Sequence, residues 1–305
     1  MRNKILVLLA ALLLDEWIGE PHNRWHPVVW MGTFITRMRK NAPKTSNTNL
    51  LLYGGSITFV GSGMVGICAA LVVWFCRRLP FPLNIIAQAW LLKTTFSLRG
   101  LNKAALEVEG ALRAENLTEA RRLLSWHLVS RDTSKLDEAL VASAAISSVA
   151  ENTSDGIIAP LLWYSIGGIP AALVYRYANT GDSILGYRDQ EREWLGKIPA
   201  RTDDLLNIIP ARLTALLFVM MRPSAWAIWR RDAHKTASPN AGHPMSAMAG
   251  VLDVELEKVD HYLLNAGARQ PNVEDLRTTR RLMYGVTAVL IFLLMVGFGL
   301  RHKHD

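Results

Sequence analysis

Acids, amides and basic residues gather between Arg131 and Arg212, in one of the more apolar parts of the chain. An ionisable group in apolar surroundings loses its hydration, so it is retained where it is paired or where it binds a metal or a ligand. The sequence therefore predicts that function resides in this segment. In chain order the groups are Arg131-Asp132, Glu151-Asn152-Thr153-Ser154-Asp155-Gly156, Asn179-Thr180-Gly181-Asp182-Ser183 and Arg201-Thr202-Asp203-Asp204.

Glu151 and Asp155 are the first two acids that could act together. A helix from Ser148 to Asp155 would place both carboxylates on one face, with Asn152 beside them. Mg²⁺ is commonly held by one or two carboxylates together with substrate phosphates, so this spacing predicts a Mg²⁺-phosphate site. The alternative is that Asn152, Thr153, Ser154 or Asp155 caps a helix that begins at Gly156.

Two later motifs each combine an acid with an amide at helical spacing. Asn179 precedes Asp182, and the pair Asp203 and Asp204 precedes Asn207. Side chains three or four residues apart on a helix are neighbours, so each motif can serve one ion or one phosphate network. We expect both motifs to bind a metal-phosphate group.

Arg201 and Arg212 flank the second of these motifs. Arginine beside acids can form ion pairs with them, or it can bind phosphate or carboxylate through two parallel hydrogen bonds. The sequence leaves both roles open. Two turn-rich loops, 15–32 with His26 and 238–244 with Asn240, are further candidates. A lone histidine is more often a surface or capping residue than a ligand.

The apolar residues of this chain of 305 residues are bunched, which is typical of a membrane protein. Uncharged runs at Leu50–Cys76 and Leu282–Leu300 exceed the roughly 18 residues needed to span hydrocarbon. Weaker or interrupted runs occur at Ile5–Leu14, Phe81–Leu92, Gly156–Tyr175 and Leu205–Met221. Broken apolar segments suit helices that kink or line a cavity. We expect roughly four to six membrane-associated helices.

The predicted fold is an all-α, polytopic integral membrane protein forming a single domain over residues 1–305. Apolar residues at three-to-four spacing between Leu98 and Leu128 predict an amphipathic helix pair that breaks near Glu115-Asn116, within a more soluble helical region at 98–155. No stretch alternates as a strand does, so no sheet is expected. The presumed active-site motifs lie at 131–212 and 238–244.

Charge and cysteine content exclude other classes. The net charge of +8 is concentrated beside the apolar runs, where it matches anionic headgroups. No basic stripe is interleaved with exposed aromatics, so we expect no nucleic-acid partner. Cys68 and Cys76 both lie in an apolar run and are expected to be inert. The N-terminal apolar run is followed by Asp15-Glu16-Trp17, so we expect an uncleaved first helix.

Taken together, the motifs resemble the cobinamide-phosphate synthase family of cobalamin biosynthesis, known as CbiB or CobD. The resemblance extends from about Leu14 to Leu290, and many ordered motifs make it specific. The matching positions are Asp15, Gly19, Pro21, His26, Pro27, Val28, Gly32, Arg131-Asp132-Thr133, Val149–Gly156, Ala159-Pro160-Leu161, Asn179, Thr180, Asp182, Ser183, Gly186, Tyr187, Ala200–Arg212 and Ser238-Pro239-Asn240.

The chain departs from the family pattern at several positions. Ser147 stands where the family usually has Glu, and this departure matters most because position 147 would share a helix face with Glu151. It puts the number of metal ions or the rate in doubt more than the reaction. The other departures are Glu20 for Asp, Ser130 for Gly, Ser143 for Arg, Gly181 for Leu and Arg192 for Tyr.

The resemblance implies an adenosylcobinamide-phosphate synthase, a ligase that uses ATP and Mg²⁺ to join adenosylcobyric acid to aminopropanol phosphate or a related amino-alcohol. It implies a multi-pass protein of the inner, or plasma, membrane, with its site facing the cytoplasm and other late cobalamin-pathway membrane enzymes as partners. Catalytic roles are expected for Asp132 and for the metal ligands Glu151, Asp155, Asp182, Asp203 and Asp204. Substrate or phosphate binding is expected for Arg131, Asn152, Thr153, Asn179, Ser183, Arg201, Asn207, Arg212, His26 and Asn240.

Three questions stay open at this stage. The general base is Asp132 or His26, and the sequence does not choose between them. The acid motifs also suit a Mg²⁺-dependent membrane phosphotransferase or prenyltransferase. The loss of the carboxylate at 147 also permits a non-catalytic membrane sensor or transporter. No Walker A or dinucleotide fingerprint is present, so a nucleotide site would be non-standard.

Overall fold

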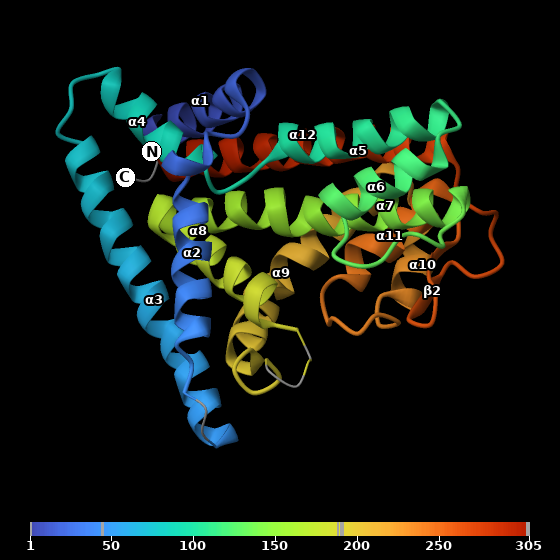
Figure 1. Ribbon diagram of the computed structural model, residues 1–305. Coiled ribbons are helices and arrows are strands. Elements are labelled where there is room, and N and C mark those ends of the chain that lie inside the picture. The colour runs from blue at the N-terminus through green and yellow to red at the C-terminus, as the bar shows by residue number, and fades with distance from the viewer. Residues whose placement is uncertain (1, 44–45, 188, 190–191, 303–305) are drawn as a thin grey trace. The chain divides into compact units, whose positions relative to one another are not determined.

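A computed structural model describes residues 2–43, 46–187, 189 and 192–302, and it is mostly helical, which confirms the all-α prediction. Arg188, Gln190 and Glu191, inside the predicted 131–212 region, lie outside the described residues. The elements (Figure 1) are α1 Arg2–Ile18, a 3₁₀ turn η1 Asn23–Trp25, α2 Pro27–Lys40, α3 Asn47–Cys76, α4 Leu83–Lys93, α5 Leu98–Arg113, α6 Leu117–His127, α7 Glu138–Thr153, a π-helical turn η2 Ser154–Ile158, α8 Ala159–Leu185, α9 Lys197–Met221, α10 Ala225–Asp232, α11 Gly242–Leu252, β1 Leu256–Lys258, β2 Tyr262–Leu264 and α12 Val273–His302.

Within the described residues, four helical segments are long and apolar enough to cross a membrane. They are Asn47–Cys76, Glu138–Leu185, Lys197–Met221 and Val273–Leu300, and each contains an apolar run found in the sequence. The protein is therefore a multi-pass membrane protein. The runs at the start of the chain and at Phe81–Leu92 form α1 and α4, of 17 and 11 residues. These two helices are shorter than the roughly 20 residues that a transmembrane helix needs.

The amphipathic pair is confirmed as α5 and α6, but the expectation of no sheet is wrong at one place. Strands β1 and β2 form an antiparallel hairpin in which Leu256 faces Leu264 and Lys258 faces Tyr262. Each strand has only three residues, too few for an alternating pattern to stand out from the sequence. The turn between them includes Asp260 in the left-handed conformation, with φ of 62°.

The described chain forms two compact units. Unit 1 comprises Met1–Ser97, Ala159–Asn207 and Leu294–Asp305, and unit 2 comprises Leu98–Ile158 and Ile208–Leu293. The boundary passes through α9 and α12, so each of these helices contributes to both units. Whether the chain acts as one domain, as the sequence suggested, stays a prediction.

In unit 1, α8 packs against α2 and α3 (Figure 1). Glycine residues on α3 permit this close packing. A Cβ at Gly61 of α3 would lie 1.9 Å from the Tyr177 hydroxyl, and one at Gly54 would lie 1.9 Å from the Leu195 carbonyl oxygen. The Tyr177 hydroxyl also donates a hydrogen bond to the Ile57 carbonyl at 2.8 Å. Glycine thus allows α3 to lie directly on the Tyr177 side chain of α8.

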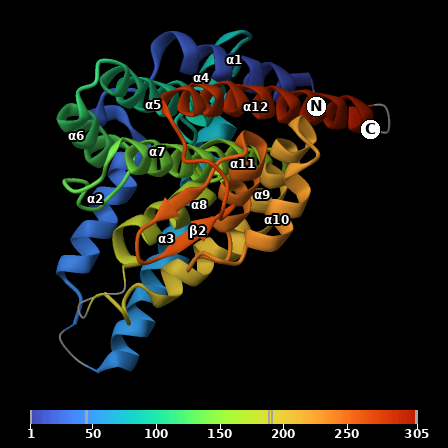
Figure 2. The ribbon, with the colours of Figure 1, turned by 90° about the vertical axis from the view of Figure 1, so that its right-hand side faces the viewer.

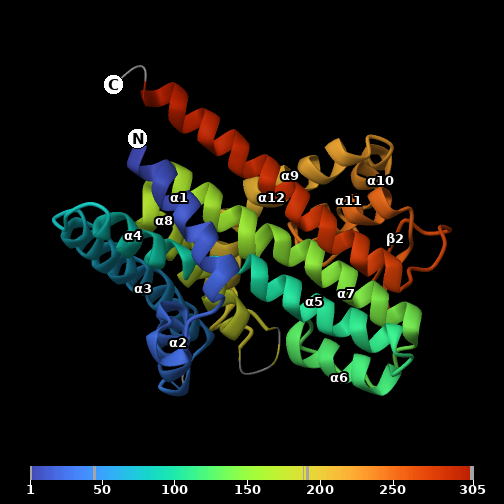
Figure 3. The same cartoon turned by 90° about the horizontal axis from the view of Figure 1, so that it is seen from above.

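A buried lysine joins α1 to α4, two helices that lie side by side (Figure 3). The Lys93 side chain of α4 is fully buried, and its Nζ lies 3.4 Å from Asp15 Oδ1 and 3.0 Å from Glu20 Oε1. Glu20 Oε2 also contacts His26 Nε2 at 2.8 Å. A buried charge requires partners of this kind, because desolvation is not otherwise offset. Lys93 therefore holds the end of α1 and the following loop against α4.

In unit 2, α7 lies at the centre. It packs against α5, α6, α11 and β1, and α10 packs on α11. Figure 2 shows α10, α11 and the hairpin on one side of α7. Every residue of α7 from Val141 to Ala150 is buried, and small residues such as Ala142, Ala144 and Ala145 allow the neighbours to approach on all sides. The chain stays helical into η2, so the alternative of a capped helix starting at Gly156 is wrong.

Replacing Gly61 with alanine should destabilise the protein by about 1–3 kcal/mol, because a methyl group there overlaps the buried Tyr177 ring and hydroxyl. The thermal unfolding midpoint of the purified protein in detergent would measure this. Gly63→Ala is the matched control on the same helix, since a Cβ there meets no atom within 4 Å. Equal midpoints for the two variants would contradict the packing described here.

Glu20 should make the stability depend on acid pH. Burial alone would raise its pKa, but hydrogen bonds from His26 and Ser97 and the Lys93 ammonium outweigh burial and lower the pKa from 4.5 to about 2. The stabilisation is then fully present above pH 4.5 and is lost as pH falls toward 2. We expect the midpoint difference between wild type and Glu20→Gln to shrink over that range. The exposed-acid variant Glu193→Gln should show no such change, and a constant Glu20→Gln difference would refute the coupling.

Candidate functional site

The acid and amide motifs of unit 1 meet where the end of α8 lies beside the start of α9. Asp203 Oδ1 accepts a hydrogen bond from Asn179 Nδ2 at 3.3 Å, and Asp203 Oδ2 accepts one from Asn207 Nδ2 at 3.0 Å. The Tyr175 hydroxyl in turn donates to Asn207 Oδ1 at 2.8 Å. Asp203 is only 8% exposed, so this network orients a buried carboxylate.

Two further acids surround Asp203. Asp182 and Asp204 both lie close enough to repel it electrostatically. The Arg201 guanidinium lies 3.8 Å from Asp204, but 74% of its side chain is exposed, so it offsets little of the negative charge. Three mutually repelling carboxylates in a largely buried place form a site that favours a cation.

Smaller features complete this acid cluster, which we define as Asp182, Asp203 and Asp204. Arg176 donates to Asn179 Oδ1 at 3.0 Å, and its Nε is buried without a hydrogen-bond acceptor among the described residues. A Cβ at Gly186 would lie 2.0 Å from Asp182 Oδ1, so only glycine admits the Asp182 carboxylate. The Ser183 hydroxyl donates to the Asn179 carbonyl at 2.9 Å, which ties it to its own helix.

The acid cluster suits Mg²⁺ by its donor set. Carboxylate oxygens are the ligands that this ion prefers, and phosphates of a substrate usually supply the rest. Among the described residues, no three His, Cys, Asp or Glu side chains are arranged so that protein groups alone could hold a metal. Asn179 and Asn207 point their amide nitrogens at Asp203, so in this arrangement they position that carboxylate. A bound phosphate would therefore have to complete the coordination.

His26, also in unit 1, has both ring nitrogens engaged. Its Nδ1 accepts a hydrogen bond from the Val28 N–H at 3.2 Å, so it caps α2, and its Nε2 lies 2.8 Å from Glu20. A histidine with both nitrogens engaged has no free position from which to take a proton from a substrate. The structure thus gives His26 a capping role and weighs against it as the general base, while its role in substrate binding stays a prediction.

Glu151 and Asp155 lie at the junction of α7 and η2 in unit 2. Glu151 is in the last turn of α7, and Asp155 is the second residue of the π-helical turn. Asn152 donates to the Ser148 carbonyl at 2.9 Å, and Thr153 donates to the Val149 carbonyl at 2.7 Å. Single π-helical turns occur frequently at functional sites, which supports a functional role for this motif.

The β1–β2 hairpin brings two residues to Glu151 that sequence reasoning missed. Burial and the neighbouring Arg131 guanidinium lower the pKa of Lys258, against the opposing influence of Glu151. Tyr262 faces Lys258 across the hairpin and interacts electrostatically with the same two groups. Arg131 and Lys258 therefore make a cationic position beside a carboxylate. A lone lysine and tyrosine, far from Arg131 along the chain, carried no signal in the sequence.

Ser143 and Ser147, two departures from the family pattern, both contact the hairpin. The Ser143 hydroxyl donates to the Glu257 carbonyl at 3.1 Å and accepts from the Glu257 N–H at 2.7 Å. Ser147 is 3% exposed. Burial raises the pKa of the Tyr262 phenol, and the nearby Ser147 hydroxyl opposes this rise. Small hydroxyl side chains at both positions leave room for the hairpin.

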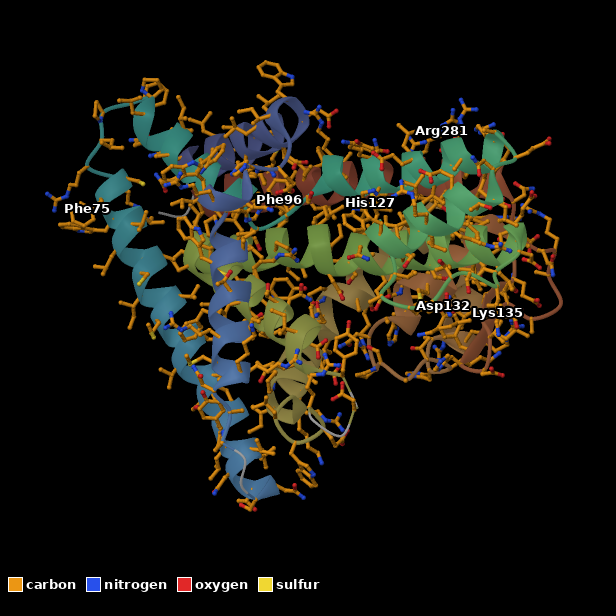
Figure 4. The ribbon with its side chains drawn as sticks, viewed as in Figure 1. Phe75, Phe96, His127, Asp132, Lys135 and Arg281 are labelled. Atoms are coloured by element: carbon orange, nitrogen blue, oxygen red, sulfur yellow. The ribbon has the colours of Figure 1, made fainter. Side chains whose placement is uncertain are left out.

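Asp132 lies on the exposed loop between α6 and α7, as does Lys135 (Figure 4). Its two carboxylate oxygens accept hydrogen bonds from the Ser134 N–H at 2.9 Å and the Ser134 hydroxyl at 3.0 Å. These bonds lower the pKa of Asp132. A carboxylate with a lowered pKa is a weaker base, which weighs against Asp132 as the group that accepts a proton.

Arg212 and Asn240, predicted separately from the sequence, are bonded to each other in unit 2. Arg212 NH1 donates to Asn240 Oδ1 at 3.0 Å and to the Ile208 carbonyl at 2.9 Å. The Ser238 hydroxyl accepts from the Asn240 and Ala241 N–H groups, each at 3.2 Å, which fixes the 238–244 loop. The guanidinium is thereby oriented, and it keeps further donors for an anion.

Comparison with known proteins identifies the chain's relatives. The family model described as CobD/Cbib protein matches residues 8–296. The chain is 40% identical over 271 residues to the "Probable cobalamin biosynthesis protein CobD" of Methanothermobacter thermautotrophicus, covering 86% of this chain and 87% of that protein. It is 36% identical over 310 residues to the "Cobalamin biosynthesis protein CbiB" of Salmonella typhimurium, covering 95% and 96%. No solved structure matches the chain. The chain belongs to the CobD/CbiB family of cobalamin biosynthesis proteins.

Proposed function

We propose that the protein is an ATP-dependent amide ligase that joins adenosylcobyric acid to aminopropanol phosphate, or a related amino-alcohol, to give adenosylcobinamide phosphate. The observation that carries this proposal is the acid cluster. In it, the buried Asp203 carboxylate accepts hydrogen bonds from Asn207 of its own motif and from Asn179 of the preceding motif. The names of the relatives support a corrinoid substrate over the phosphotransferase, prenyltransferase and sensor alternatives.

The proposed reaction has two steps. A carboxylate is a poor acylating agent, so its oxygen first attacks the γ-phosphorus of ATP, giving an acyl phosphate and ADP. The amine of aminopropanol phosphate then attacks the acyl carbon, the amide C–N bond forms, and inorganic phosphate leaves as the amine loses a proton. Phosphoryl transfer of this type relies on positioning and on cations around the phosphate more than on a protein nucleophile.

In unit 1, we assign metal binding to Asp182, Asp203 and Asp204. Mg²⁺ held there would neutralise the charge of bound phosphates. Asn179 and Asn207 hold Asp203 in one orientation, so the ligand oxygens are positioned before a substrate arrives. In unit 2, Glu151 and Asp155 keep the metal-binding role proposed from their spacing.

Also in unit 2, Arg131, Lys258 and Arg212 are assigned to phosphate binding. Arg212 is oriented by Asn240, and Arg131 lies beside Lys258 and Glu151. Guanidinium groups suit phosphate because their planar donors form paired hydrogen bonds. We place the site on the cytoplasmic side of the inner membrane, near other late enzymes of the pathway.

Replacing Asp203 with asparagine should reduce formation of adenosylcobinamide phosphate by at least about tenfold and raise the Mg²⁺ requirement, because a metal ligand is lost. The assay uses purified protein with ATP, Mg²⁺, adenosylcobyric acid and aminopropanol phosphate. Folding should be retained, because the substitution removes a buried negative charge.

Asp253→Asn is the matched control, since this carboxylate is exposed and lies outside the acid cluster. Near wild-type activity and Mg²⁺ dependence in Asp203→Asn would refute the metal assignment. Turnover of a lipid extract without corrinoid, with no amide product from the wild type, would favour the transferase alternative instead.

Lys258→Met should raise the KM for one of the two phosphate-bearing substrates by about tenfold, because a charged hydrogen bond to phosphate contributes about 1.5–3 kcal/mol. Lys258→Arg should restore most of the affinity. The control is Lys135→Met, which removes an exposed lysine from the loop that carries Asp132 (Figure 4). A loss confined to stability, with both KM values unchanged, would leave Lys258 only a structural role.

A further inference from the structure

A cavity of about 780 Å³ lies in unit 1, among α1, the end of α3, α4 and a break in α8. Its floor is buried and apolar, with Val7 2%, Val73 6% and Ile169 3% exposed. Its rim is open, since Trp74 and Ile166 are 49% and 60% exposed. The lining residues are Asn3, Lys4, Val7, Ala70, Val73, Trp74, Arg77, Asn84, Gln88, Tyr164, Ile166, Gly167, Gly168, Ile169 and Pro170.

The charge of this cavity is positive. Lys4 and Arg77 are among the lining residues, and no lining residue in the described part of the chain is acidic. The Arg78 guanidinium lies 4.5 Å from the centre of the Trp74 ring at the rim. The acid cluster carries the opposite charge and a different ligand preference. It is separated from the cavity by about 20 Å of helix, from Gly168 to Asp182 along α8.

The cavity also lies at the level where a membrane surface is expected. Arg77 directly follows the candidate span Asn47–Cys76. Phe75, 64% exposed, projects from the end of α3 away from its neighbours (Figure 4). Tryptophan and arginine at the end of an apolar helix are typical of the headgroup region. The exposed apolar rim therefore faces acyl chains while Arg77 lies among headgroups.

The break in α8 places the start of a helical segment at the cavity. Gly168 has φ of 72°, outside helical geometry, and the helix restarts at Ile169-Pro170. Pro170 has no N–H, so among the cavity-lining residues of the restarted segment Ile169 carries the backbone N–H, and the helix dipole favours an anion there. Irregular backbone at membrane depth is tolerated where it lines a cavity, which accounts for the placement of this break.

We propose that this cavity binds an anionic glycerophospholipid, with its phosphate between Lys4, Arg77 and the restarted helix of α8 and the upper part of an acyl chain against Trp74 and Ile166. A soluble phosphate shares the same anion chemistry but would leave the apolar floor and rim uncovered. The site is separate from the proposed ligase chemistry, so its test does not depend on that activity.

The test measures lipid retained by the full-length protein, by native mass spectrometry after purification from nanodiscs of phosphatidylcholine with or without phosphatidylglycerol. Wild type should retain phosphatidylglycerol in preference to phosphatidylcholine. Lys4→Gln and Arg77→Gln should each reduce that retention about fivefold, the effect of one cation near an anionic surface. Ala70→Trp should also reduce it, because the larger side chain obstructs the cavity with both cations intact.

The matched control is Arg37→Gln with Lys40→Gln, which removes two exposed cations at the end of α2. It should retain phosphatidylglycerol as the wild type does. Equal retention of the two lipids, or wild-type retention in both the cation variants and Ala70→Trp, would overturn the proposal. Displacement of the lipid by millimolar glycerol 3-phosphate would identify a soluble anion site instead. Thermal midpoints in phosphatidylcholine alone confirm that each variant is folded.

Discussion

Asp203 is a carboxylate buried in a protein whose helices are apolar enough to span a membrane, and unit 1 is arranged around the need to stabilise it. Burial of a charge is tolerated only with fixed donors or a cation, and here Asn179 and Asn207 supply the donors from α8 and α9. The bond from Asn179 joins α8 to α9 at this point. Asp182 and Asp204 lie close enough to repel Asp203, and carboxylates gathered in this way suit a cation.

The hairpin illustrates how a departure from a family pattern can be accommodated. The small hydroxyl at Ser143 bonds to the backbone of β1, and Ser147 lies beside Tyr262 of β2. Both positions lie on one face of α7, so the hairpin lies close to that helix and carries Lys258 to Glu151. Where the family usually has a carboxylate, Ser147 of α7 thus contacts the hairpin. Glu151 still has Lys258 as a cationic neighbour.

Prediction from the sequence succeeded where the signal is local. Long apolar runs identified the candidate spans, three-to-four periodicity identified α5 and α6, and acid–amide spacing placed Asn207 beside Asp203. The hydrogen bond from Asn179 to Asp203 joins two motifs that were predicted separately. Prediction failed for the hairpin, whose three-residue strands are stabilised by contacts with α7 rather than by their own pattern. Lys93 was also missed, because a single lysine at a helix end looks like any solvated charge until its partners are known.

The sequence by itself determined the helical membrane class, the family and the residue types available for metal and phosphate binding, because periodicity, hydrophobic length and motif order are all properties of neighbouring residues. Only the tertiary structure decided which of those residues act together. The pairing of Arg212 with Asn240 and the meeting of Arg131 with Lys258 depend on contacts between distant segments. Such contacts arise from packing and the stabilisation of buried charge, which spacing along one chain does not encode.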